Sequence, residues 1–203
     1  MKLYYAPGAC SLASHIILHE VGRPFTIERV NGKTKETETG ADFRAINPKG
    51  AVPALETDGG EVLTEGAAIL QFIADNGDVA ALSPPPGSMA RARLQEMLNY
   101  ISSELHKSFS PLFRPGLTDE GRAAALDTIA AKLGWLERTL SDGRPYLTGD
   151  AFGVADAYGF VVTGWSGMLK VDLSPFPHIL AWRARLADRA SVQAAMRAEG
   201  LAA

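Results

Sequence analysis

The chain has 203 residues, a formal net charge of −3 at pH 7 and a single cysteine. Nucleic-acid binding needs clustered Lys and Arg, and a disulfide within the chain needs a second cysteine, so neither is expected. The four histidines are scattered without a metal-ligand spacing, which argues against a zinc site. Small molecules and protein partners are therefore the expected ligands.

The apolar segments are too short for export or for membrane insertion. Pro7 and Gly8 break the apolar start of the chain, far short of the core of a secretory signal. The longest uncharged stretch, residues 157–169, is shorter than the roughly 18 apolar residues of a membrane span and predicts a buried core helix. An unpaired thiol is most stable in a reducing compartment, so we expect a cytoplasmic protein without membrane partners.

The first part of the chain mixes strand and helix signals. In chain order the patterns predict a strand at 3–5, a helix at 11–21 ended by Gly22, a strand at 25–30, a helical turn at 42–46, a hairpin of strands at 54–57 and 61–64, and a helix at 66–76 before Gly77. The polar run 31–40 has the composition of a solvated loop. This order predicts a small mixed sheet covered by helices.

The second part of the chain repeats at helical spacing. A long helix is predicted by an apolar stripe that ends before Pro111, and a further helix by the acidic residues after Thr118; the stripe consists of Leu94, Leu98, Ile101, Leu105 and Phe109. We therefore predict an α/β domain over residues 1–77, a proline-rich linker over 78–87 and an all-helical domain over 88–203.

Cys10 lies between a Pro-Gly loop and the predicted start of a helix. The partial positive charge at a helix N-terminus favours a thiolate, so this thiol is a candidate reactive group. The alternative is a small buried apolar residue, the commoner fate of a free cysteine. Residue 13 is Ala13, so no CxxC partner exists and any resolving thiol comes from outside the chain.

Two further segments suit a peptide-like ligand. Pro53 opens a predicted strand and favours a turn, with or without a cis bond, in which the backbone of Val52 can pair with an extended ligand. Glu65 and Gly66 open the helix after the hairpin, where free N–H groups attract a carboxylate and the Glu65 side chain attracts an ammonium group. The alternatives are an ordinary edge-strand proline and a simple helix cap.

Polar residues also align on the predicted long helix. Asn99, Ser103 and His106 are spaced by four and three residues, which places them on one face of an α-helix. Such a face is usually solvated surface, and it becomes a candidate ligand face only in combination with other signals.

Five motifs taken together closely resemble the bacterial beta-class glutathione S-transferases. They are YYAPGACSL at 4–12, NPKG at 47–50, VPAL at 52–55, LTEG at 63–66 and NYISSELHK at 99–107. The resemblance runs nearly end to end. It implies a thioredoxin-like α/β N-terminal domain followed by an all-α C-terminal domain, a homodimer, and glutathione as co-substrate with no other cofactor.

The resemblance assigns roles to residues of the first domain. Cys10 would contact or covalently trap the glutathione sulfur, and Val52 would pair its backbone with the tripeptide beside a cis-Pro53. Glu65 and Gly66 would hold the γ-glutamyl end.

A basic residue is also implied near glutathione. Lys35 falls at the family's position, and Lys33 in the same polar run is the alternative.

In the helical domain the resemblance implicates Asn99 and the segment of Ser103, Glu104, Leu105 and His106. By the same resemblance, His106 would polarise or deprotonate the thiol.

Two positions depart from the wider transferase pattern. Gly66 stands where many other classes carry serine, although the beta-class pattern accepts it. Gly153 stands at a helix cap where the family usually has Ser or Thr, a change that costs only a few tenths of a kcal/mol. Asp156 is expected to reach back to the Gly153 N–H.

Three functions fit these residues. The leading one is an enzyme that conjugates reduced glutathione to small hydrophobic electrophiles, as in detoxification. The second is thiol-disulfide exchange or peroxide reduction through a mixed disulfide at Cys10. The third is a non-enzymatic module that binds apolar ligands. The sequence does not separate the first two, whereas a complete glutathione site argues against the third.

Overall fold

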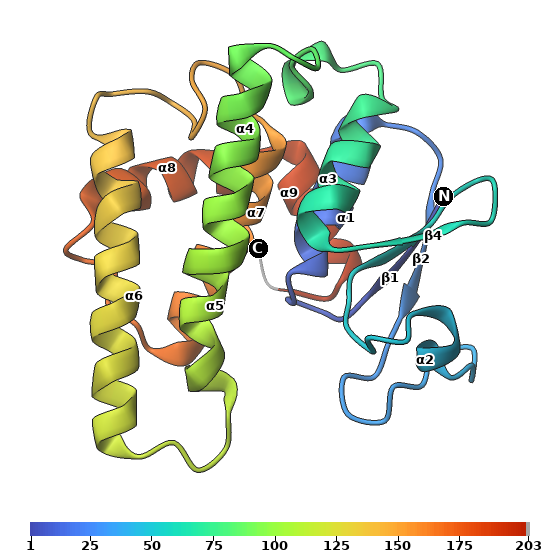
Figure 1. The fold of residues 1–203 in the computed structure, drawn as a ribbon, viewed down its shortest axis with the longest axis horizontal. Helices are drawn as coiled ribbons and strands as arrows, with labels where there is room; N and C mark the ends of the chain where they lie inside the picture. The colour runs from blue at the N-terminus through green and yellow to red at the C-terminus, as the bar shows by residue number, and fades with distance from the viewer. Residues whose placement is uncertain (202–203) are drawn as a thin grey trace. The chain divides into compact units, whose positions relative to one another are not determined.

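The computed structural model describes residues 1–201 and divides them into two compact units (Figure 1). The first unit comprises Met1–Ser83 together with the chain from Ala187 onward. The second unit comprises Pro84–Leu186. Within residues 1–201, no helix is both long enough and apolar enough to cross a membrane.

The first unit is built on a four-stranded sheet of order β2-β1-β3-β4. β1 is parallel to β2, and β3 is antiparallel to both β1 and β4. The strands are β1 (Lys2–Tyr5), β2 (Thr26–Arg29), β3 (Ala54–Glu56) and β4 (Val62–Thr64). The helices are α1 (Ser11–Val21), α2 (Phe43–Ile46), α3 (Gly66–Asp75), η1 (Ala80–Leu82) and α9 (Ala190–Ala198).

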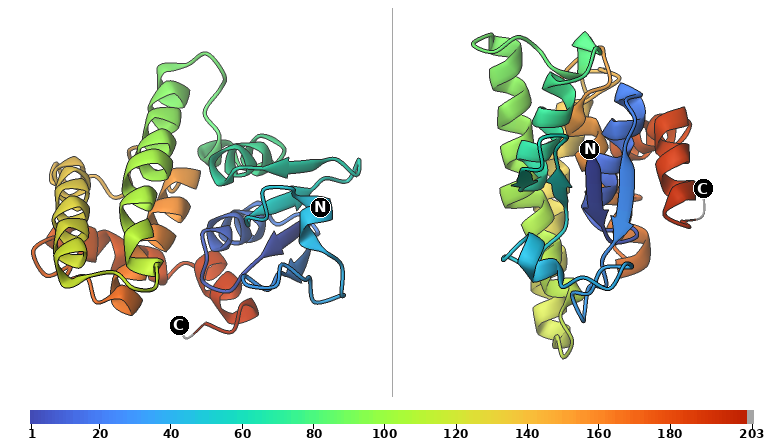
Figure 2. Two further views of the ribbon diagram at one scale, coloured as in Figure 1. Left: turned by 60° about the horizontal axis from the view of Figure 1, so that its bottom comes forward. Right: turned by 90° about the vertical axis from the view of Figure 1, so that its right-hand side faces the viewer.

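Alternation along β1 sends side chains to the two faces of this sheet. Tyr4 packs on Phe43 of α2, with ring centroids 5.7 Å apart, in a cluster that includes Val30. Tyr5 points to the other face, where its ring lies 6.0 Å from that of His15 in α1. α1 packs against both α3 and α9, and Figure 2 shows these helices from two further sides.

The C-terminal segment joins the first unit rather than the helical one. Nδ1 of His15 lies 2.9 Å from Oε1 of Glu199, and both side chains are buried. Arg189 also pairs with Glu20 of α1. The compact units therefore differ from the predicted division, which assigned the whole of 88–203 to the helical domain, because buried polar contacts attach the last helix to α1.

The second unit is entirely helical. Its elements are α4 (Met89–Asn99), the π-helical η2 (Tyr100–Leu105), α5 (His106–Phe109), the 3-10 helix η3 (Ser110–Phe113), α6 (Asp119–Leu140), α7 (Val154–Leu169) and α8 (Pro177–Ala187). The predicted long helix is thus interrupted by a π-helical segment, a feature that often marks functional sites.

α7 is the buried core helix that the uncharged stretch predicts. The Asp156 side chain, at the first turn of α7, accepts hydrogen bonds from three buried donors. These are the N–H of Gly153 at 2.9 Å, the N–H of Leu147 at 2.8 Å and Nε1–H of Trp182 at 2.9 Å. The expected contact from Asp156 back to the glycine cap is therefore confirmed.

Candidate active site

The strand register brings three predicted site segments to one end of the sheet. Ala54 of β3 lies opposite Tyr4 of β1 and opposite Thr64 of β4. Val52 lies two residues before β3 begins, so continuing the same register places it beside the loop that follows β1 and beside the start of α3. The loop carrying Cys10, the backbone of Val52 and the Glu65-Gly66 pair therefore converge.

Cys10 contacts the backbone of Val52 directly. Its Sγ–H donates to the Val52 carbonyl oxygen at 3.4 Å, and the thiol is partly exposed. Cys10 immediately precedes α1, and the Val52–Pro53 peptide is cis. Within residues 1–201 the N–H of Val52 has no hydrogen-bond acceptor. A ligand carbonyl can therefore pair with it, as in a short added strand.

The Glu65 carboxylate already holds a cation. Lys49 Nζ lies 2.5 Å from Oε1 of Glu65 and 2.7 Å from the hydroxyl of Thr64. Glu65 is exposed and takes a positive φ of 71° at the residue before α3. A Cβ added at Gly66 would lie 3.8 Å from Cγ of Pro53, an ordinary contact. Glu65 and Gly66 thus present a carboxylate and a helix N-terminus side by side. The sequence had indicated no role for Lys49.

The polar run 31–40 folds as an ordered turn, and it distinguishes the two candidate lysines. Lys35 is half-buried, and its Cε lies 3.9 Å from the position of a Cβ added at Gly50, in the segment that leads to Val52. Lys33 is exposed, and its N–H donates to the Asn31 side chain. The structure therefore brings Lys35 to the segment before Val52.

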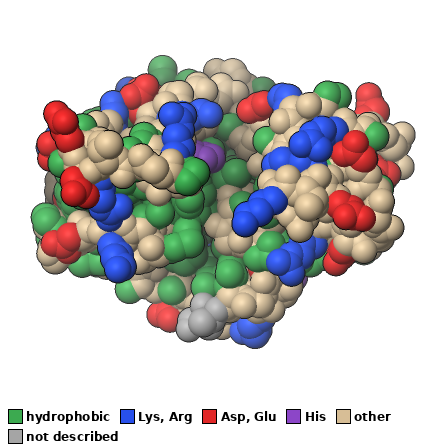
Figure 3. All heavy atoms as spheres, turned by 90° about the horizontal axis from the view of Figure 1, so that it is seen from below, with side chains coloured by type: hydrophobic (Ala, Val, Ile, Leu, Met, Phe, Trp, Pro, Cys, Tyr) green, Lys and Arg blue, Asp and Glu red, His purple; other side chains and the backbone are tan. Residues whose placement is uncertain are grey.

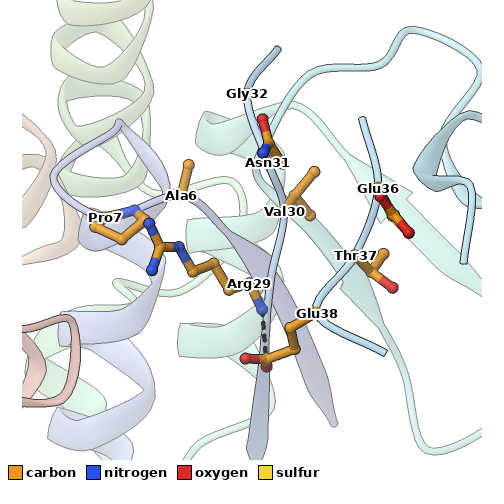
Figure 4. A pocket seen from close by; sticks show the side chains of 9 residues that line it. All are labelled: Ala6, Pro7, Arg29, Val30, Asn31, Gly32, Glu36, Thr37 and Glu38. Atoms are coloured by element: carbon orange, nitrogen blue, oxygen red, sulfur yellow. Dashed lines mark hydrogen bonds between the residues drawn. The ribbon is translucent and has the colours of Figure 1, made fainter. Parts of the chain in front are cut away.

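A pocket of about 380 Å³ opens beside the loop after β1 (Figure 4). It is lined by Ala6, Pro7, residues 29–32 and residues 36–38. Two of these residues are joined by a hydrogen bond, in which Oε1 of Glu38 accepts the Arg29 N–H at 3.0 Å. None of the predicted site residues lines this pocket, so it is distinct from the convergence at Cys10.

In the second unit, the π-helical segment changes the predicted polar face. Asn99 ends α4, and Ser103 lies within η2, where its hydroxyl donates to the Asn99 carbonyl at 2.9 Å. Both residues are exposed. A π-helix has more residues per turn than an α-helix, so spacings of four and three no longer align Asn99 and Ser103 with His106.

The two residues between Ser103 and His106 are engaged elsewhere in the second unit. Glu104 is exposed and pairs with Lys132, whose Nζ lies 2.6 Å from Oε2. Leu105 is fully buried, so its side chain belongs to the core.

His106 is turned into an aromatic cluster. Its Nδ1 lies 2.8 Å from the hydroxyl of Tyr158, and its ring centroid lies 4.7 Å from that of Trp165. Burial, with a smaller effect of Lys107, lowers the His106 pKa from 6.5 to about 4. The imidazole is therefore neutral at pH 7. Sequence reasoning missed Tyr158, which lies 52 residues away along the chain and carries no motif signal.

Metal-ligand side chains form no cluster in the described chain. On the one face drawn in Figure 3, basic and acidic side chains both lie at the surface among apolar and other side chains. No group of three or more His, Cys, Asp or Glu residues between positions 1 and 201 is arranged to hold a metal ion.

Comparison with known proteins decides the family. Residues 8–76 match the glutathione S-transferase N-terminal domain, and residues 100–190 match the glutathione S-transferase C-terminal domain. Glutathione S-transferase GstA of Escherichia coli O157:H7 is 46% identical over 201 residues, which cover 99% of this chain and 100% of that protein. The chain belongs to the glutathione S-transferase family.

Solved transferase structures share its fold. A beta-class glutathione S-transferase of Sphingomonas chungbukensis is 47% identical with a TM-score of 0.95, and the match covers 100% of both chains. A sphingomonad glutathione S-transferase complexed with glutathione is 45% identical with a TM-score of 0.95, again over 100% of both chains. The predicted family, the thioredoxin-like and all-helical fold, and the class of enzyme, a glutathione transferase, are thereby confirmed.

Proposed function

We propose that this transferase binds reduced glutathione at the sheet end of its first unit and conjugates it to small hydrophobic electrophiles. One observation carries the proposal. The Cys10 thiol lies 3.4 Å from the carbonyl oxygen of Val52, whose N–H has no acceptor in residues 1–201. A thiol peptide that pairs with Val52 would bring its own sulfur to Cys10. The sphingomonad relative that was solved with glutathione supports this ligand.

The ends of glutathione have matching partners in the first unit. The γ-glutamyl ammonium would replace Lys49 at the Glu65 carboxylate, because both cations need the same oxygen. The carboxylate of the same residue would bind at the N–H of Gly66, where the first turn of α3 leaves donors unpaired. Lys35 would hold the glycyl carboxylate as a charge partner.

His106 would stabilise the glutathione thiolate by donating a hydrogen bond. A base of pKa about 4 takes a proton poorly from a thiol whose ordinary pKa is about 8.5. This role requires the Tyr158 hydroxyl, 2.8 Å from Nδ1, to donate to that nitrogen, because the proton of the neutral ring then lies on Nε2 and can be donated to a sulfur anion.

Asn99 and Ser103 are proposed as further polar ligands, since both are exposed. Glu104 would take part while paired with Lys132, and Leu105 through its backbone only.

Apolar side chains of the second unit would receive the electrophile. Phe113 and Met168 are 49% and 68% exposed, although large apolar side chains are usually buried. The ring of Phe113 lies 5.5 Å from that of Trp165. These groups can cover a small hydrophobic molecule.

The second candidate function is redox chemistry at Cys10, and its position at the start of α1 favours it. The Cys10 thiolate would attack one sulfur of oxidised glutathione, forming a mixed disulfide and releasing one reduced glutathione. Intact mass should then show one added glutathionyl group, which dithiothreitol removes and Cys10→Ala prevents. If Cys10 reacts only after denaturation, it has a structural role instead.

We further propose a homodimeric, cytoplasmic enzyme that acts in detoxification, on the basis of the family resemblance. Light scattering at micromolar concentration should give twice the mass of the chain, and a monomeric mass would contradict the dimer.

Turnover assays with purified protein and reduced glutathione separate the functions. Electrophiles, disulfides and hydroperoxides are compared under the same conditions. Conjugation predicts turnover of electrophiles, the redox alternative predicts turnover of disulfides or hydroperoxides, and a binding module predicts none.

A further inference from the structure

Glu199 connects the C-terminal segment to the loop that carries Cys10. Its Oε2 accepts the N–H of Gly8 at 2.9 Å, and its Oε1 lies 2.9 Å from Nδ1 of His15. The Glu199 side chain has 0% exposure, and that of His15 has 1%. A buried carboxylate persists only when hydrogen bonds replace its water, so these contacts fix its position and that of the loop.

Two further contacts hold this loop. The hydroxyl of Ser11, the first residue of α1, accepts from the Ala6 N–H at 3.2 Å and lies 3.3 Å from the Ala6 carbonyl oxygen. From the C-terminal segment, Leu201 covers Gly8, whose φ is +70°, at 3.6 Å from the position of an added Cβ. Cys10 follows two residues after Gly8, so the position of its sulfur depends on this anchoring.

We propose that Glu199 is a positioning residue that holds the loop of residues 6–10 so that the Cys10 sulfur stays beside the carbonyl of Val52. The proposal rests on the proposed glutathione chemistry of Cys10. Displacements of about 1 Å can slow a directed reaction by up to about 100-fold, so a looser loop should react more slowly with a bound partner. A small reagent that needs no oriented encounter should not be slowed.

The chain offers a matched control. Glu20, near the end of α1, pairs with Arg189 just before α9. This second pair also attaches the C-terminal segment to α1, yet no contact of Glu20 reaches the loop of residues 6–10 in the described chain. Glu20→Gln therefore weakens the same attachment without releasing Gly8.

The test measures two reactions of Cys10 in wild-type protein, Glu199→Ala, Glu199→Gln and Glu20→Gln. Glutathionylation by oxidised glutathione is followed by intact mass, and alkylation by iodoacetamide is followed in parallel. The first reaction forms the Cys10–glutathione disulfide and releases one reduced glutathione. Thermal unfolding of each variant checks that the compared proteins are folded.

We expect Glu199→Ala to slow glutathionylation by about 10-fold while alkylation slows by less than about 2-fold. Glu199→Gln keeps an acceptor for the Gly8 N–H, so it should be slowed less. Glu20→Gln should match the wild type in both reactions. If Glu199→Ala does not fold, Glu199→Gln and Leu201→Ala replace it in the test. Glu199→Gln weakens the contact of Glu199 with Gly8 and keeps that of Leu201, whereas Leu201→Ala removes the contact of Leu201 and keeps that of Glu199.

Equal slowing of both reactions, or unchanged glutathionylation in the folded Glu199 variants, would overturn the positioning role. A wild-type protein that takes up no glutathione would show instead that the proposed chemistry of Cys10 is wrong, and the positioning role would fall with it. The wild-type measurement thus distinguishes the two failures.

Discussion

The hydroxyl of Tyr158 lies 2.8 Å from Nδ1 of His106, so the direction of this hydrogen bond sets the tautomer of the imidazole. Because burial lowers the His106 pKa to about 4, the ring carries a single proton at neutral pH. A hydroxyl that donates to Nδ1 leaves that proton on Nε2. In that arrangement His106 is suited to stabilise an anion rather than to accept a proton.

Replacing His106 should therefore slow conjugation without abolishing glutathione binding. His106→Ala removes the donor, and we expect kcat/KM for the electrophile to fall by about 100-fold, the usual loss for one donor to a developing anion. Tyr158→Phe keeps the imidazole and frees its tautomer, so its loss should be smaller. Steady-state kinetics at saturating glutathione measures both variants. A kcat/KM of His106→Ala within twofold of wild type would contradict the role.

The same histidine predicts a dependence of stability on pH. The folded-state pKa of about 4 lies below the ordinary value of 6.5, so the unfolded chain binds this proton first as the pH falls. The contribution of His106 to the free energy of unfolding is thus present above pH 6.5 and lost between pH 6.5 and about 4. Full loss corresponds to about 3 kcal/mol.

Urea unfolding at pH 7 and pH 4.5 measures this loss. His106→Gln should show a smaller decrease between the two pH values than the wild type does. His178→Gln is the control, because that histidine is 49% exposed. Equal pH dependence in all three proteins would contradict the assignment of the proton to His106.

Glu65→Ala should weaken binding of reduced glutathione by about ten- to a hundredfold, since a hydrogen bond to a charged group contributes about 1.5–3 kcal/mol. Glu61→Ala is the matched control, an exposed glutamate one residue before β4. Titration calorimetry compares the two with the wild type. Unchanged affinity in Glu65→Ala would exclude this carboxylate as the partner of the ammonium group.

The second unit should depend strongly on Asp156. Asp156→Ala leaves the N–H of Gly153, the N–H of Leu147 and the Trp182 indole without their acceptor, and we expect a loss of about 3–5 kcal/mol in the free energy of unfolding. Gly153→Ser adds a capping hydroxyl where a Cβ has ordinary contacts, so it should gain a few tenths of a kcal/mol. Denaturant unfolding measures both, and a loss under 1 kcal/mol for Asp156→Ala would contradict this account.

Local signals allowed most elements to be predicted. The apolar pattern of α1 and its Gly22 cap, at a φ of 72°, depend on neighbouring residues only, and the helix has the predicted bounds. Gly77 shows the limit of such signals. Asn76 rather than Gly77 caps α3, and a Cβ at Gly77 would lie 2.7 Å from Cγ1 of Val21. That glycine permits a close approach between two helices, which no local pattern reveals.

The candidate site likewise contains features that the sequence predicted and features that only the folded structure shows. The convergence of Cys10 with Val52 follows from the register of β1, β3 and β4, of which the sequence predicted only the hairpin of β3 and β4. The turn of His106 toward Tyr158 depends on a π-helical segment that periodicity did not indicate. The contact of Gly8 with Glu199 joins residues 191 positions apart, so only the folded chain shows it.

Activation of glutathione for conjugation can be measured by following the absorbance of the thioether that forms from reduced glutathione and an activated aryl halide. We expect a rate far above that of the uncatalysed reaction, saturation in glutathione, and the loss described above in His106→Ala. A rate equal to the uncatalysed one, in a protein that calorimetry shows to bind glutathione, would show that this chain does not activate glutathione for conjugation.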